Sequence, residues 1–275
     1  MKTPPLPPTS AQAISRRLLL ALFALATSGL GMAPGPALSQ ETAQTLLARS
    51  DAVRNPAFSY STRVVLSEYK AGREQDTMVL RSYARPAQRK GEYQTLVSFL
   101  RPSRDLGKHM LKNGNDLWFY DPAGNASIRL SPQQRLLGQA ANADVVSTSL
   151  SADYVATIDS SEEITDGERQ RRTATKLSLR ASTPSAGYPR VEVWVDGSSA
   201  APIRARFFSD SGALLKTIFY RKFRTELGAS RPTEYVIIDG VDPKSVTLMQ
   251  FDEFRAVDIP AQWLQKDHMP LLKPE

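Results

Sequence analysis

From Phe58 onward, hydrophobic and polar residues alternate with a period of two, which is typical of strands that bury one face. The segment 190–196 shows the pattern clearly, because its three valines share one face and its two acidic residues share the other. Turn signals such as Asn113-Gly114 separate these runs, and no helix between them is long enough for a crossover. The sequence therefore predicts an antiparallel meander with strands at 58–66, 77–85, 93–101, 107–112, 116–120, 126–130, 154–158, 173–180, 190–196, 203–208, 214–223, 233–239 and 245–254.

Helical spacing is confined to short segments. Residues 41–53 carry apolar side chains at helical intervals, and Asn55-Pro56 ends that pattern. The small and polar residues of 138–149 predict a mobile loop. The other predicted helical segments are short, at 131–138, 151–154 and 260–266.

One face of so large a sheet is apolar and must be covered, and the available helices are few. We therefore expect a mainly β fold, a strongly curved antiparallel sheet of about a dozen strands with short helices lidding its concave apolar face. Thin cover over a curved sheet tends to leave an apolar hollow that can hold a ligand.

The first 39 residues have the three parts of a cleavable signal peptide. A basic start ends in Arg16-Arg17, an apolar run covers 18–26, and small residues precede a cleavage site after Ser39, with Ala33 as a second option. The apolar run is about half of the ~20 residues that a membrane span requires. The paired arginines suit either the Sec or the twin-arginine route, and both stay open. We expect residues 40–275 to form one mature domain in the periplasm.

Composition narrows the class of protein. Loss of residues 1–39 leaves 236 residues and lowers the formal net charge from +7 to +4, because that segment has three basic and no acidic residues. The densest basic cluster, at 169–172, lies beside acidic residues, which favours a solvated hairpin end over a nucleic-acid site. The chain has no cysteine, which excludes cysteine nucleophiles, zinc–thiolate sites and an acylated anchor after the signal peptide.

No residue pattern predicts catalysis. The two histidines, His109 and His268, lie far apart and neither belongs to a metal-binding motif. Asp210-Ser211-Gly212 is interpreted as a hairpin turn rather than a nucleophile, and 239–242 as a turn rather than a calcium loop. We therefore expect no enzyme activity, cofactor or metal, with a hydrolase of unfamiliar site as the remote alternative.

Several segments, taken in order, resemble a known family. A Gly-containing strand at 106–111, a Trp-x-Tyr-x-Pro strand at 116–122 and a basic strand at 128–131 resemble the centre of the LolA-like outer-membrane lipoprotein-sorting proteins. Consecutive hairpins from 193 to 216 and the ending from 232 to 260 follow the same family. The resemblance implies an incomplete barrel with a lidded concave side. It also implies a periplasmic carrier of acyl chains, on lipoproteins or as free lipid, with an RND-type exporter as partner.

The chain departs from the family at 138–149, which is rich in Ala and Ser, and no position matches a gating arginine. The residues expected to line the cavity are Phe58, Tyr60, Val97, Phe99, Trp118, Val193, Phe207, Leu215 and Phe219. For each of them, ordinary core packing is the alternative. We expect a monomer. The rival function is an envelope accessory or scaffold protein that docks on a transporter, carries nothing and has a filled interior.

Overall fold

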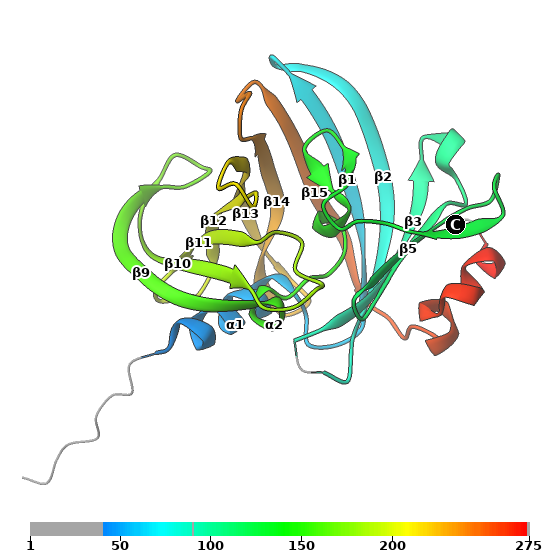
Figure 1. Ribbon diagram of the computed structural model, residues 1–275, viewed down its shortest axis with the longest axis horizontal. Coiled ribbons are helices and arrows are strands. Elements are labelled where there is room, and N and C mark those ends of the chain that lie inside the picture. Colours follow the sequence, from blue (N-terminus) through cyan, green and yellow to red (C-terminus); the bar gives the residue numbers. More distant parts are fainter. Residues whose placement is uncertain (1–40, 90, 274–275) are drawn as a thin grey trace, which may run out of the picture. The chain divides into compact units, whose positions relative to one another are not determined.

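The computed structural model describes residues 41–89 and 91–273, and the predicted signal peptide lies outside them. Thirteen strands form one antiparallel sheet in the order β6-β5-β4-β3-β2-β1-β15-β14-β13-β12-β11-β10-β9 (Figure 1). The strands of this sheet are β1 (Tyr60–Lys70), β2 (Arg73–Pro86), β3 (Tyr93–Arg101), β4 (His109–Asn113), β5 (Asp116–Asp121), β6 (Ala126–Arg129), β9 (Tyr154–Thr165), β10 (Arg171–Ala181), β11 (Arg190–Asp196), β12 (Pro202–Phe208), β13 (Leu214–Glu226), β14 (Ala229–Asp239) and β15 (Ser245–Ala256). The predicted curved and unclosed antiparallel sheet is confirmed.

The sheet consists of two meanders that are joined at its centre. Strands β1 to β6 follow one another in space, as do β9 to β15, and β1 pairs with β15 from Tyr60–Ala256 to Lys70–Ser245. The short β6 and the long β9 remain as edges. Figure 1 shows the sheet curling round, so that both meanders face the same hollow side.

Alternation decides which face of each strand is buried. On β11, Val191, Val193 and Val195 are buried on the concave side, together with Leu177 and Leu179 of β10. These residues belong to one continuous core that runs under both meanders and extends as far as Met110 of β4 and Leu117 of β5. The concave face is therefore the main site of hydrophobic burial.

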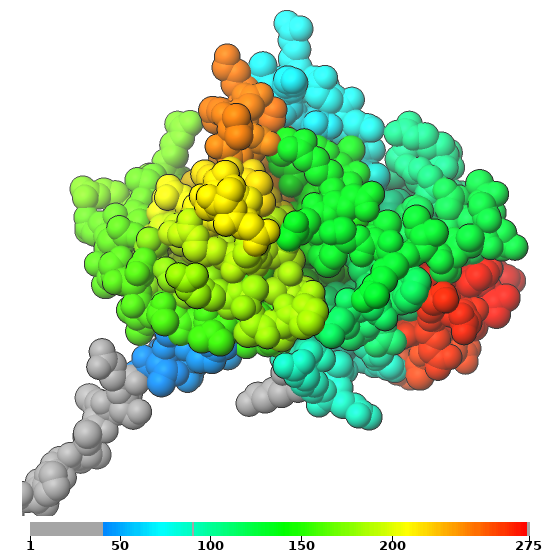
Figure 2. Space-filling model, in the orientation of Figure 1, coloured from blue at the N-terminus to red at the C-terminus, as the bar shows by residue number. Residues whose placement is uncertain are grey.

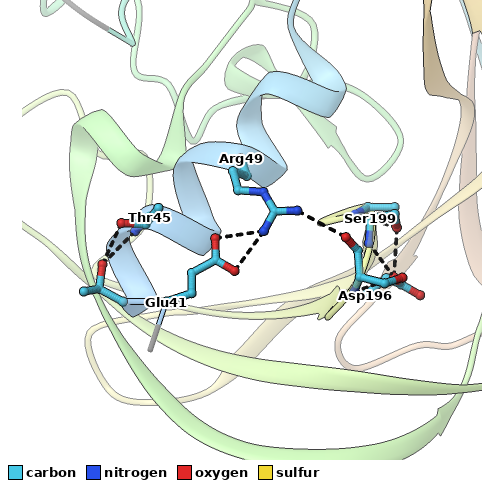
Figure 3. Close-up of polar contacts among 8 residues, drawn as sticks. Glu41, Thr45, Arg49, Asp196 and Ser199 are labelled. Atoms are coloured by element: carbon cyan, nitrogen blue, oxygen red, sulfur yellow. Dashed lines mark hydrogen bonds and ion pairs between the residues drawn. The ribbon is translucent and has the colours of Figure 1, made fainter. Parts of the chain in front are cut away.

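Helix α1 (Ala43–Arg54) follows Thr42, whose side chain accepts a hydrogen bond from the Thr45 backbone N–H. Its Leu46 and Leu47 are buried in the core. On the opposite side, Arg49 donates to both carboxylate oxygens of Glu41, at 2.8 and 2.9 Å, and to the Ser198 carbonyl at 3.2 Å (Figure 3). Arg49 thus ties the helix to the turn between β11 and β12.

The chain ends in two 3-10 turns, η3 (Ala261–Leu264) and η4 (Lys266–Leu271), where the sequence predicts a short helix. They cover the other face of β3 to β5, where Leu264 and Met269 are fully buried. Trp263 meets Tyr83 edge to face, with ring centroids 5.5 Å apart. A second, smaller core therefore lies on the convex side of the sheet.

The helical prediction for 131–138 is wrong. The chain there forms a turn followed by β7 (Arg135–Leu137) and β8 (Ala140–Ala141), a separate two-stranded ribbon. Gly138 makes this possible with a φ of +54°, a conformation that costs glycine little. The ribbon is followed by the 3-10 turn η2 (Asn142–Asp144) and by α2 (Leu150–Asp153), a single helical turn in the predicted 151–154 region. One further 3-10 turn, η1 (Ser103–Asp105), links β3 to β4.

Candidate functional site

Residues 131–153, which we call the lid, lie across the concave face of the sheet. Figure 1 shows this green segment in front of β1 and β15, and Figure 2 shows it filling the middle of that side. Ala140, Val145 and Val146 of the lid are buried in the main core. The predicted loop at 138–149 is therefore a packed segment that closes the hollow.

A buried ion pair fixes the middle of the lid. The Lys216 ammonium on β13 contacts the Asp144 carboxylate, and the two side chains are only 4% and 8% exposed. The Lys216 Nζ also lies 5.0 Å from the ring centroid of Tyr188 and 5.1 Å from that of Phe207. Burial opposes the charge on Lys216, but Asp144 and Tyr188 outweigh it and the pKa of Lys216 is raised. The Lys216 ammonium therefore keeps its proton inside the fold.

A second polar group fixes the end of the lid to helix α1. The Asp51 carboxylate accepts hydrogen bonds from Ser149 Oγ at 2.8 Å and from the Ser151 backbone N–H at 2.7 Å. Asp51 also pairs with Arg54 one turn further along the helix. Next to it, Asn55 Nδ2 donates to the Thr148 carbonyl at 2.9 Å. The lid is thus held by directional polar contacts, which can be exchanged for water, as well as by its buried apolar side chains.

Under the lid lies a small space, which we call the inner cavity, with a volume of about 110 Å³. Its wall includes Arg54 and the phenol rings of Tyr60, Tyr220 and Tyr235. Burial raises the pKa of all three phenols, so their hydroxyls are neutral near pH 7. An engineered cavity of about 150 Å³ holds one benzene, so the inner cavity is too small for an acyl chain while the lid is closed.

A second hollow, the outer groove, has a volume of about 400 Å³. It lies between the lid and strands β2 to β6, with a floor made of Met78, Phe99, Phe119, Ile128 and Leu137. Charged residues at its rim form ion pairs, as in Arg104 with Asp76 and Lys108 with Asp105. This volume is within the ~300–1,000 Å³ that is usual for ligand sites.

Five of the nine predicted cavity residues lie on the concave side. Tyr60 and Phe207 line the inner cavity, and Phe99 lines the outer groove. Val97 and Val193 are buried in the main core. The structure brings these five side chains onto one face, and ligand contact by them stays a prediction.

The other four predicted residues lie elsewhere. Phe58 precedes β1 and is exposed. Trp118 packs against the second core, with Lys266 Nζ 4.7 Å from its ring centroid. Leu215 and Phe219 of β13 alternate with the residues of that strand that line the inner cavity, and Leu215 is 40% exposed. None of these four lines either hollow.

Sequence reasoning missed the polar residues that hold the lid. Lys216 and Asp144 give no local signal, since a lysine in an alternating strand predicts a solvent-facing position. Ile218 and Tyr220, which share the face of Lys216, line the inner cavity instead of Leu215 and Phe219. Because Lys216 is buried, the face of β13 that lines the inner cavity is the one that carries the lysine, and not the face of Leu215 and Phe219 that the sequence pattern indicated.

Comparison with known proteins shows which of them share this architecture. A family model described as an uncharacterized protein matches residues 91–270. No curated protein matches the chain. Among solved structures, a LolA superfamily protein from Nitrosomonas europaea is 30% identical, with a TM-score of 0.74 over 83% of this chain and 100% of that one.

Two further structures share the fold at lower identity. A DUF1329 family protein from Desulfovibrio piger is 19% identical, with a TM-score of 0.70 over 82% of this chain and 97% of that one. An outer membrane lipoprotein-sorting protein domain from Vibrio parahaemolyticus is 17% identical, with a TM-score of 0.67 over 83% and 98%. Within residues 41–89 and 91–273, no helix has the length and apolar character to cross a bilayer. By its full-length match to the Nitrosomonas protein, the chain belongs to the LolA superfamily.

Proposed function

We propose that this protein is a periplasmic carrier that binds the acyl chains of lipoproteins or lipids and moves them toward the outer membrane. In this proposal residues 1–39 direct export and are removed, and an RND-type transporter in the inner membrane supplies the cargo. The observation that carries the proposal is the lidded concave face with its apolar outer groove of about 400 Å³. Membership of the LolA superfamily and the shared fold of the lipoprotein-sorting domain from Vibrio parahaemolyticus support it.

The energetics of the groove favour acyl chains. Each methylene removed from water contributes about 0.8 kcal/mol, so a chain of modest length gains several kcal/mol in an apolar groove. The inner cavity, with a volume of about 110 Å³, is too small to hold an acyl chain unless the lid moves. We therefore propose that the acyl chain first occupies the outer groove and extends inward as the lid is displaced.

Uptake of a fluorescent fatty acid by the purified mature protein tests the proposal. We expect saturable binding that unlabelled palmitate reverses. Ile128 lines the groove yet is 55% exposed, so Ile128→Asp places a charge in the groove without burying it in the core. This change should weaken uptake at least about tenfold, which corresponds to ~1.4 kcal/mol.

A matched control is available at Val241, which is 89% exposed in the turn between β14 and β15. Val241→Asp introduces the same charge far from the groove and should leave uptake unchanged. Absence of uptake by the unmodified protein would instead support a scaffold protein that docks on a transporter and carries nothing.

A further inference from the structure

Two neighbouring arginines on β12, Arg204 and Arg206, share one tryptophan on the convex face of the sheet. The guanidinium carbons lie 3.9 Å and 5.2 Å from the ring centroid of Trp194. Both residues alternate with Ala205 and Phe207, which belong to the main core on the concave face. The arginine pair therefore lies on the side of the sheet away from the lid and its hollows.

Neither arginine forms a hydrogen bond or an ion pair with any residue in the described part of the chain. Their Nε atoms are buried without a hydrogen-bond partner there. Every other buried or half-buried lysine or arginine at 41–89 and 91–273 donates to a carboxylate, an amide or a backbone carbonyl. Buried guanidinium N–H groups without acceptors cost free energy, so this exception is informative.

The nearest carboxylates are already engaged. Glu162 accepts the indole N–H of Trp194 at 2.6 Å. Glu192 lies 3.4 Å from Lys176 and 3.3 Å from Arg190. Desolvation, and then repulsion from Arg206, lower the pKa of Arg204. The fold thus holds two like charges together, and Glu162 and Glu192 attract Arg204 without forming an ion pair with either arginine.

An apolar strip adjoins the arginines on the next strand. In the register of β12 and β13, Phe219 is opposite Arg204 and Thr217 is opposite Arg206. Leu215, two residues before Thr217 on the same face of β13, is 40% exposed. A ligand at the arginines would therefore touch apolar side chains on one flank.

We propose that Arg204 and Arg206 bind a carboxylate side chain of a protein partner, whose apolar residues pack on Leu215 and Phe219. Two guanidinium groups offer parallel N–H donors that match a carboxylate, and stacking on Trp194 holds them in place. The site lies on the opposite face from the lid, so it goes beyond the acyl-chain function proposed above.

The local charge balance favours a protein partner over an anionic membrane. Lipid surfaces attract clusters of about four to eight basic residues. Here four cations are interspersed with three carboxylates, which leaves a net charge of only +1. These residues are Lys176, Arg190, Arg204 and Arg206 on one side and Asp159, Glu162 and Glu192 on the other.

Nuclear magnetic resonance of the arginine Nε–H groups in the full mature protein tests the proposal. The probes are two capped peptides, one alternating Leu with Glu and the other alternating Leu with Gln. We expect the Nε–H signals of Arg204 and Arg206 to shift with the Glu peptide only. Arg204→Gln with Arg206→Gln should weaken that binding at least about tenfold, since charge-assisted pairs are the strong ones.

The matched control changes two exposed arginines, Arg180 and Arg224, to Gln and should bind the Glu peptide as the unmodified protein does. The peptide titration uses the unmodified protein, so it decides the matter even if the double variant folds poorly. Equal response to both peptides would overturn the proposal. A third outcome would overturn it in favour of a membrane contact: neither peptide binds, the unmodified protein binds phosphatidylglycerol vesicles, and the double variant does not.

Discussion

At the scale of single residues, buried charges decide how the lid is held. Lys216 and Asp144 are oppositely charged, buried and in contact, one on β13 and the other in the lid. Removal of one partner from such a pair leaves the other charge buried without a counter-charge, whereas replacement of both partners by apolar residues is often tolerated. This difference between the single and the double replacement distinguishes a buried ion pair that holds the lid from an ion pair on the surface.

Asp144→Asn should therefore lower the free energy of unfolding by about 3–5 kcal/mol, because Lys216 stays buried without a counter-charge. The double change Asp144→Leu with Lys216→Met should cost less than the single change. Urea denaturation of the three proteins measures both. If the single variant were as stable as the unmodified protein, Lys216 would have to reach solvent, and the lid would not be latched there.

His109 gives a second prediction at this scale. It is buried on the convex face beside Ser98, whose Oγ lies 3.1 Å from Nδ1, and burial lowers its pKa to about 4. The unfolded chain, with a pKa near 6.5, binds the proton more readily between these values. Stability therefore falls as the pH drops from about 6.5 to about 4, by about 3 kcal/mol over the whole window.

His109→Leu should flatten this part of the pH profile, whereas the same profile should persist in His268→Gln, which changes the other histidine. The measurement is urea denaturation at several pH values between about 4 and 7.5. An unchanged slope in the His109 variant would show that other groups carry the pH dependence.

Residue-level prediction from sequence succeeded where alternation is regular and failed where a polar residue is buried. The valines of β11 show their buried face directly. On β13 the burial of Lys216 depends on Asp144, which is 72 residues away in sequence. No local pattern contains that information, so Leu215 and Phe219 were placed on the wrong phase for the inner cavity.

At the scale of elements, the lid is where sequence and structure differ most. Residues 131–138 lack a β-like alternation and contain a proline and a glycine, which suggested a short helix. The chain instead forms β7 and β8, because its backbone finds partners in the sheet, such as Gln139 N–H to Thr247 Oγ1 at 2.8 Å. Tertiary contacts of this kind override weak local preference.

A designed disulfide tests whether the lid must move. A Cβ on Gly187, in the loop between β10 and β11, would lie 3.8 Å from the Cβ of Ala143 in the lid. That spacing suits a disulfide, and the chain has no other cysteine. In Gly187→Cys with Ala143→Cys, we expect oxidation to reduce acyl-chain uptake at least about tenfold and reduction to restore it.

Each single cysteine variant serves as the control, and its uptake should not depend on redox conditions. Equal uptake by the oxidised and reduced double variant would mean that the closed structure already accommodates the cargo. In that case the outer groove alone, with its volume of about 400 Å³, would be the binding site.

At the scale of the whole molecule, the sequence predicted the fold class but not the pairing that joins its halves. Periodicity located the strands of the sheet, and short turns implied the hairpins. The pairing of β1 with β15 joins residues that are distant in sequence, such as Tyr60 and Ala256. Only the burial of a common concave face selects this pairing. The hollows arise from that closure and are therefore invisible to local patterns.

The central claim is that the concave side carries lipid, and native mass spectrometry of the protein purified gently from the cell envelope tests it most directly. We predict a bound species that leaves on denaturation and contains at least one acyl chain after solvent extraction. Protein that is consistently free of lipid, and that takes up no fatty acid in solution, would contradict the account.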